Sequence, residues 1–138
     1  MRQRYFLIEP KYSDPDTFCS FIVGSDRVRA SIQIYADLWM FERVAAALTA
    51  PSLEEEGPID IFSHPDKGDT FDFQLTVLPH KGENKRLRFR ISQDLLDDGA
   101  PYQADIRFDL SPEEAEEFAK ELKAWCENPD SAFSWKGD

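Results

Sequence analysis

The sequence predicts an α+β domain, in which an antiparallel sheet of about six strands carries two helices packed on one face. Several short segments alternate apolar and polar residues with a period of two, which is typical of half-buried strands. Two longer segments repeat apolar residues at helical spacing. Short turns join the strand segments, which favours antiparallel pairing. The chain of 138 residues is expected to form a single domain, 1-138.

The first half of the chain contains three predicted strands and a helix. The strands cover 4–9, closed by Pro10, then 17–23, and 27–35 after a turn at 24–26. In the third strand one face is apolar and is expected to be buried. It consists of Val28, Ala30, Ile32 and Ile34. A helix follows over 38–49, with Asp37 as its N-cap and Pro51 beyond its end.

The second half contains the clearest strand pattern. A short edge strand is predicted over 59–62, and a loop over 63–69. Three strands over 70–78, 86–92 and 102–110 are then expected to form a meander. Its predicted buried residues are Phe73, Leu75, Phe89, Ile106 and Phe108.

A second helix follows the meander and has strong end signals. Ser111 is the predicted N-cap, Pro112 takes the first helical position, and Glu114 completes a capping box. Asn128-Pro129 ends the helix. The tail, 131–135, is expected to add a short strand or to pack its aromatic residues on the domain.

The two halves, 1-50 and 58-127, follow the same plan of three strands and then a helix. The segment Ile32–Asp37 aligns without a gap on Ile106–Ser111. One interpretation is a tandem βββα pseudo-repeat that arose by duplication. The other is that two strand-to-helix units obey the same physical rules.

The charge of the chain restricts its partners. Lys and Arg number 16 against 27 Asp and Glu, which gives a formal net charge of −11. A field of this sign repels phosphate backbones and anionic lipid surfaces, so we expect no nucleic-acid or membrane partner. It attracts a basic protein partner. The sequence shows neither a bilayer-length apolar run nor a secretory signal, so a cytoplasmic location is expected.

Residues with catalytic or metal-binding potential are few. His64 lies among several aspartates in 60–69, where the same residue types serve a turn or a metal site, and we favour the turn. Cys19 and Cys126 have no CxxC spacing and are expected to be buried and reduced. Nucleophile-elbow and phosphate-binding motifs are also lacking. We therefore predict no cofactor and no metal, and the sequence favours a protein that is not an enzyme.

A row of arginines marks the polar face of the predicted meander. Arg86, Arg88 and Arg90 alternate along the central strand. The neighbouring strands offer Asp72, Asp105 and Asp109. The row has two interpretations. Either the ion pairs fix the register of the strands, or the arginines form an anion-binding site.

The first helix is apolar nearly all round, unlike the second. Trp39, Met40 and Val44 exceed what a single sheet-facing stripe requires. Another element of the chain could cover them, with Trp135 of the tail as a candidate. A second copy of the chain could also cover them, because Trp and Met are favoured in interfaces. The residues of this possible interface are Trp39, Met40, Val44 and Trp135.

The sequence leaves the function open between two hypotheses. The leading hypothesis is a non-catalytic, acidic protein-interaction domain, for example an immunity-type inhibitor of a basic toxin, or a homodimer built on the first helix. The alternative is a small-ligand binder or enzyme with an aromatic cleft between the two halves, in which an arginine of the row holds an anion.

Overall fold

The described residues form eight strands and two helices. A computed structural model of the chain describes residues 3–12, 17–50, 59–66, 69–79, 81–95 and 101–137. In chain order the elements are β1 (Arg4–Tyr12), β2 (Phe18–Ser25), β3 (Arg29–Tyr35), α1 (Leu38–Thr49), β4 (Ile59–Asp66), β5 (Asp69–Pro79), β6 (Lys85–Asp94), β7 (Tyr102–Leu110), α2 (Pro112–Glu127) and β8 (Phe133–Gly137).

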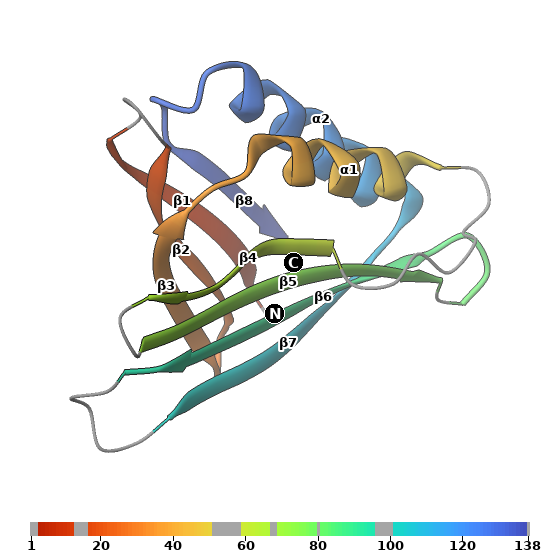
Figure 1. Cartoon of the computed structure of the whole chain (residues 1–138). Coiled ribbons are helices and arrows are strands. Elements are labelled where there is room, and N and C mark those ends of the chain that lie inside the picture. The colour runs from red at the N-terminus through yellow and green to blue at the C-terminus, as the bar shows by residue number, and fades with distance from the viewer. Residues whose placement is uncertain are drawn as a thin grey trace.

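The strands form two sheets rather than the single sheet expected. Sheet 1 has the order β3-β2-β1-β8, and sheet 2 has the order β4-β5-β6-β7. All strand pairs are antiparallel, so the α+β class and the predicted meander are confirmed. Figure 1 shows the two sheets as two sides of a wedge, with both helices over its open side. Both meanders have an apolar inner face, and the wedge lets the two faces cover each other.

The plan of strands and helix is the same in the two halves. In each half three consecutive strands pair as a meander and a helix follows. Each sheet then gains a fourth strand, β4 beside β5 in sheet 2 and β8 beside β1 in sheet 1. The tail therefore adds a strand, which was one of the two arrangements expected for it. A duplication as the origin of this plan is not confirmed.

Several strand boundaries differ from the prediction, and those of β1, β4 and β3 have a clear reason or consequence. β1 does not stop at Pro10 but continues to Tyr12, with a register shift between Pro10 and Tyr12. Proline is tolerated at such bulges. β4 extends to Asp66, through residues predicted as loop, because the chain keeps its pairing with β5. β3 begins at Arg29, and Val28, expected on the buried face, is 51% exposed.

Both helix starts are as predicted. Asp37 accepts a hydrogen bond from the Trp39 amide at 3.1 Å at the N-cap of α1. At the start of α2, Ser111 and Glu114 form the reciprocal capping box, with both bonds at 3.1 Å. The C-terminus of α1 is stabilised from a distance, because the Lys85 ammonium on β6 donates to the carbonyls of Ala47, Leu48 and Ala50.

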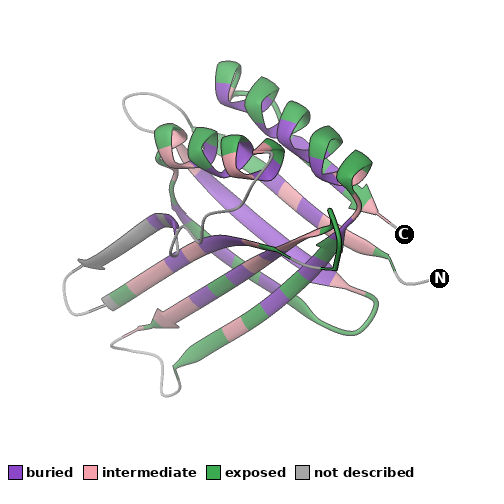
Figure 2. Ribbon diagram, turned by 90° about the vertical axis from the view of Figure 1, so that its right-hand side faces the viewer, coloured by how far each residue is buried: buried purple, intermediate pink, exposed green. Residues whose placement is uncertain are grey.

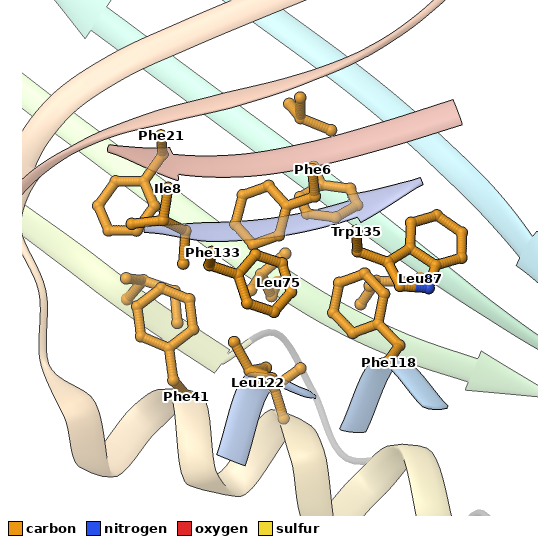
Figure 3. Close-up of a cluster of buried hydrophobic side chains, with 14 of the residues drawn as sticks. Phe6, Ile8, Phe21, Phe41, Leu75, Leu87, Phe118, Leu122, Phe133 and Trp135 are labelled. Carbon is orange, nitrogen blue, oxygen red and sulfur yellow. The ribbon is translucent and has the colours of Figure 1, made fainter. Parts of the chain in front are cut away.

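Aromatic side chains fill the space between the sheets and the helices (Figure 3). Phe6 of β1 lies at the centre, with its ring 5.0 Å from Phe89 of sheet 2 and 6.1 Å from Phe118 of α2. Phe21 of β2 packs on Phe41 of α1 at 5.5 Å. The helices therefore lie on the inner side of both sheets. All five meander residues predicted to be buried are confirmed as core residues.

Candidate functional site

Two of the four residues proposed for an interface are core residues. Val44 is 0% exposed and Trp135 is 2% exposed, so neither is accessible to a partner. Met40 is partly buried and packs against the core. Helix α1 is apolar on several sides because it touches α2 as well as β4 and β5. Only Trp39 remains on the surface, with 67% of the residue exposed.

The surroundings of Trp39 are mainly acidic. Asp37 caps the helix directly below it, and Glu42 follows one turn later on the same side of α1. The end of α2 also lies here, because the Cys126 thiol contacts the Leu38 carbonyl at 3.8 Å. Glu127 follows Cys126 in the sequence, and its charge acts on the Cys126 thiol. One cation, Arg43, also lies one turn from Trp39.

An open groove runs between the outer sides of α1 and α2, starting at Glu42. Its volume is about 650 Å³. It is lined by Glu42, Ala45, Ala46, Thr49, Glu116, Ala119, Lys120 and Lys123. The alanines keep the groove open, and Figure 2 shows the outward sides of both helices largely exposed. Trp39 and this groove together form a continuous exposed surface on the helix layer, which we call the helix-end surface.

Burial disfavours the thiolate form of both cysteines. Burial raises the pKa of Cys19 to about 11. Burial, together with the charges of Glu42 and Glu127, raises the pKa of Cys126 to about 12. Both side chains are buried and free, as expected from the sequence. Since the thiolate is the reactive form, neither cysteine is suited to covalent catalysis.

Two arginines of the β6 row form ion pairs, and the third, Arg90, does not among the described residues. Arg86 binds Asp109 at 2.6 Å, and Arg88 binds Asp105 at 2.5 Å. The Arg88 hydrogen bond lowers the pKa of Asp105, and the charges of Arg107 and Arg90 act in the same direction. Within the described part of the chain, Arg90 forms neither a hydrogen bond nor an ion pair. Arg86 and Arg88 thus form the cross-strand ion pairs that the register-fixing interpretation requires.

Arg90 lines a polar hollow on the outer face of sheet 2. The hollow has a volume of about 500 Å³. Its other lining residues are Asp72, Gln74, Ile91, Ser92, Gln103, Ala104 and Asp105. They come from three adjacent strands, and their side chains combine amides, a hydroxyl and carboxylates around one guanidinium. The aromatic residues lie on the opposite face of this sheet, so aromatic residues and Arg90 do not share a cleft.

Several predicted features concern parts of the chain outside the described residues. The side chain of His64, considered for a turn or a metal site, belongs to this group. In the described ranges, no cluster of three or more His, Cys, Asp or Glu is arranged to hold a metal ion. Nor does a described helix have the length and apolarity needed to cross a bilayer.

Comparison with known proteins gives no relative. The chain matches no protein-family model, no curated protein and no solved structure.

Sequence reasoning missed one surface, the outer face of sheet 1. Tyr12, Phe18 and Tyr35 form an aromatic cluster there, with Tyr12 47% and Tyr35 42% exposed. The signal was in β2, whose sequence FCSFIVGS lacks the alternation of a strand with one solvated face. Its burial on both faces follows from this pattern.

Proposed function

We propose that the chain is a non-catalytic protein-binding domain of the cytoplasm that binds a basic protein through the helix-end surface. The observation that supports this most is Trp39, which is 67% exposed beside the cap residue Asp37 and one helical turn from Glu42. Tryptophan is among the residues that dominate binding energy when a partner buries them. The neighbouring carboxylates favour a partner whose contact region is cationic.

The size of the Trp39 contribution follows from its exposed area. A tryptophan buries up to about 250 Å². Burial of the exposed two-thirds therefore removes roughly 150 Å² from water, worth about 3–4 kcal/mol. The groove beside it supplies further apolar contact from Ala46, the exposed one of its three alanines. Its lysines, Lys120 and Lys123, restrict where the positive groups of the partner can lie.

An immunity-type inhibitor of a basic toxin is the specific form of this proposal. The charge of −11 supports it, because such a field raises the association rate with a cationic protein. Helix α2 contributes to this field with six glutamates against two lysines. An inhibitor needs no catalytic group of its own, which agrees with the protonated thiols of Cys19 and Cys126.

The test is capture from a lysate of the source organism on the immobilised protein. Wild type, Trp39→Ala, Glu42→Gln and Tyr102→Ala are compared, and Tyr102 serves as a matched exposed aromatic residue on another element. We expect the wild type and Tyr102→Ala to retain a basic protein that Trp39→Ala loses. The retained protein is then purified, and its binding is measured by calorimetry at several salt concentrations. Its toxicity is assayed by growth, with and without co-expression of this chain.

The salt dependence provides a second criterion. We expect affinity to fall as ionic strength rises and to fall further in Glu42→Gln. Retention of the same protein by Trp39→Ala, capture of only acidic proteins, or no capture at all would each refute the proposal. If the captured partner is basic but not toxic, the proposed binding function stands and the immunity-type role is refuted.

A second candidate function is the binding of a small anion at Arg90. The observation in its favour is that Arg90 lines the hollow on sheet 2 without an ion pair among the described residues. Gln74, Ser92 and Gln103 offer uncharged hydrogen bonds there. Nuclear magnetic resonance titration with inorganic phosphate and with succinate tests this function. Shifts confined to this face, and lost in Arg90→Gln but not in Arg107→Gln, would support it.

A further inference from the structure

The outer faces of the two sheets differ sharply in chemistry. Strand register places residues that pair across strands on the same face. On sheet 2 this rule gives a charged outer face, with Arg86, Arg88, Arg90 and Arg107 among Asp72, Asp105 and Asp109. On sheet 1 it gives an outer face with three charged residues, Glu9, Arg29 and Lys136. Sheet 1 therefore exposes a face with an unusually low charge for a solvated sheet.

The residues of this face form four rows across the strands. The first row is Lys136, Tyr5, Gly24 and Arg29, and the second is Ser134, Leu7, Ile22 and Ser31. The third row is Glu9, Ser20 and Gln33, and the fourth is Tyr12, Phe18 and Tyr35. Beyond the first row lies the β2–β3 turn, with Arg27 and the exposed Val28. We call this set of residues the sheet 1 outer face.

The margins of the sheet 1 outer face are accessible, whereas its β2 residues Ser20, Ile22 and Gly24 are buried. Glu9, Ser31, Gln33 and Tyr35 are exposed, and the helices pack on the inner side of the sheet. The centre is nevertheless tightly packed, because Ile22 is only 5% exposed and the side chain of Tyr5 lies over Gly24. A flat apolar centre with aromatic residues at one end and charges around it is typical of a protein interface.

We propose that the occupant of the sheet 1 outer face is a second copy of this chain, related by a two-fold axis. The axis runs across the strands along the row of Leu7 and Ile22. This arrangement stacks the half-buried Leu7 on its own copy, as self-complementary interfaces do. Ile22 is only 5% exposed and lies beneath this contact rather than in it. Stacked sheets of this kind lie about 10 Å apart with their strands within about 30° of each other.

Charge complementarity supports a second copy in this register. Successive rows lie about 7 Å apart, because side chains on one face recur every second residue. The two-fold axis therefore places Glu9 of one copy over the first row of the other copy, beside Lys136. The same contact occurs twice in the dimer.

The exposed aromatic cluster finds its counterpart in the same register. The row of Tyr12 and Tyr35 lies about 14 Å from the axis, and the β2–β3 turn lies about 14 Å away on the opposite side. The aromatic rings then meet Val28 and Arg27 of the second copy. Apolar contact and arginine stacking on aromatic rings both stabilise such a pairing. Three of the exposed large apolar residues, namely Tyr12, Val28 and Tyr35, are thus covered by one arrangement.

The distribution of charge favours this face over the others for self-association. The chain carries a net charge of −11, and α2 contributes six glutamates against two lysines. Contact through sheet 1 places both helix layers on the far sides of the dimer, where their repulsion is screened. It also leaves the groove between the helices open on each copy, so this inference does not depend on the proposed function.

The size of the face indicates the strength of the dimer. The four strands, with four rows and the β2–β3 turn, span about 19 by 27 Å, or roughly 500 Å² per copy. This is below the roughly 800 Å² per partner of a standard stable interface. We therefore expect a reversible dimer that dissociates on dilution.

The test is a charge swap read by sedimentation velocity over a wide concentration range. Glu9→Lys and Lys136→Glu each create two like-charge contacts, and each should raise the dissociation constant roughly tenfold or more. The double variant, Glu9→Lys with Lys136→Glu, restores opposite charges and should recover much of the affinity. Val28→Asp should also weaken the dimer. Glu117→Lys and Lys120→Glu on α2 are matched controls and should leave it unchanged.

Each outcome of this experiment decides the proposal. Weakening by both single variants and recovery in the double variant supports it, provided that all variants unfold at the wild-type urea midpoint. A wild type that is monomeric at every concentration overturns the proposal. A dimer whose dissociation constant is unchanged by both charge reversals also overturns it. A dimer lost in Trp39→Glu but kept in Glu9→Lys would place the interface on α1 and would likewise overturn it.

Discussion

Replacement of Lys85 by methionine should destabilise the protein by separating β6 from the end of α1. The Lys85 ammonium donates to three carbonyl oxygens, those of Ala47 at 3.1 Å, Leu48 at 2.6 Å and Ala50 at 2.8 Å. The last turn of α1 has no basic residue of its own. Lys85 is therefore the cation that stabilises the negative end of this helix dipole.

The size of the effect can be bounded from these contacts. Hydrogen bonds to a charged group contribute about 1.5–3 kcal/mol when removed, and a cation at a helix C-terminus contributes up to about 2 kcal/mol. Burial lowers the pKa of Lys85, which shows that the ammonium loses hydration and offsets part of this gain. The freed carbonyls of Lys85→Met regain water. We therefore expect a loss of about 2 kcal/mol in the free energy of unfolding.

Urea unfolding followed by circular dichroism measures this loss. Lys81→Met, in the exposed turn before β6, is the matched control and should leave the midpoint unchanged. Lys85→Arg should be intermediate, because a planar guanidinium cannot reach three converging carbonyls as an ammonium does. Amide exchange in the last turn of α1 should accelerate in Lys85→Met. Equal midpoints for Lys85→Met and Lys81→Met would refute the capping role.

Three further predictions concern stability and reactivity. Ser111→Ala should lower the free energy of unfolding by about 0.5–2 kcal/mol through loss of the capping box, as measured in urea. Cys19 and Cys126 should resist a thiol reagent in the native protein and react on unfolding, since burial raises both pKa values; rapid native labelling would contradict this. The hydrogen bond from Arg88 lowers the pKa of Asp105 in the folded protein. Ionised Asp105 therefore stabilises the fold above the ordinary carboxyl pKa, and this stabilisation disappears as pH falls through the lowered pKa. Asp105→Asn should accordingly lower the free energy of unfolding slightly at neutral pH. Its urea midpoint should also change less with pH in the acid range than that of the wild type.

The parts of the fold that could be predicted depend on local signals. The capping box at Ser111 needs contacts only three residues apart, and the meander needs alternation and short turns. Alternation also indicated which meander residues are buried, because the period of two fixes the face of each side chain. These signals are independent of how the two halves pack together.

The parts that could not be predicted depend on distant contacts. The division into two sheets requires the inner faces of both meanders to meet, as Phe6 and Phe89 do. The C-terminal cap of α1 comes from Lys85, which is too distant in sequence for local patterns to reveal the contact. In α1, the apolar pattern identified Trp39 and Val44 together. Only the packing of α2, β4 and β5 decides that Val44 is buried and Trp39 is not.

The pairing of β8 with β1 affects the order in which the protein can fold during synthesis. β1 leaves the ribosome first among the strands, yet Arg4 pairs with Gly137, which is translated after all the other elements. Until then sheet 1 lacks a strand, and the core lacks Phe133 and Trp135. Nascent chains therefore expose one edge of β1 and the inner side of α2 until β8 emerges. Interrupted translation before β8 would yield chains that chaperones and proteases recognise, so only chains that include β8 can complete sheet 1.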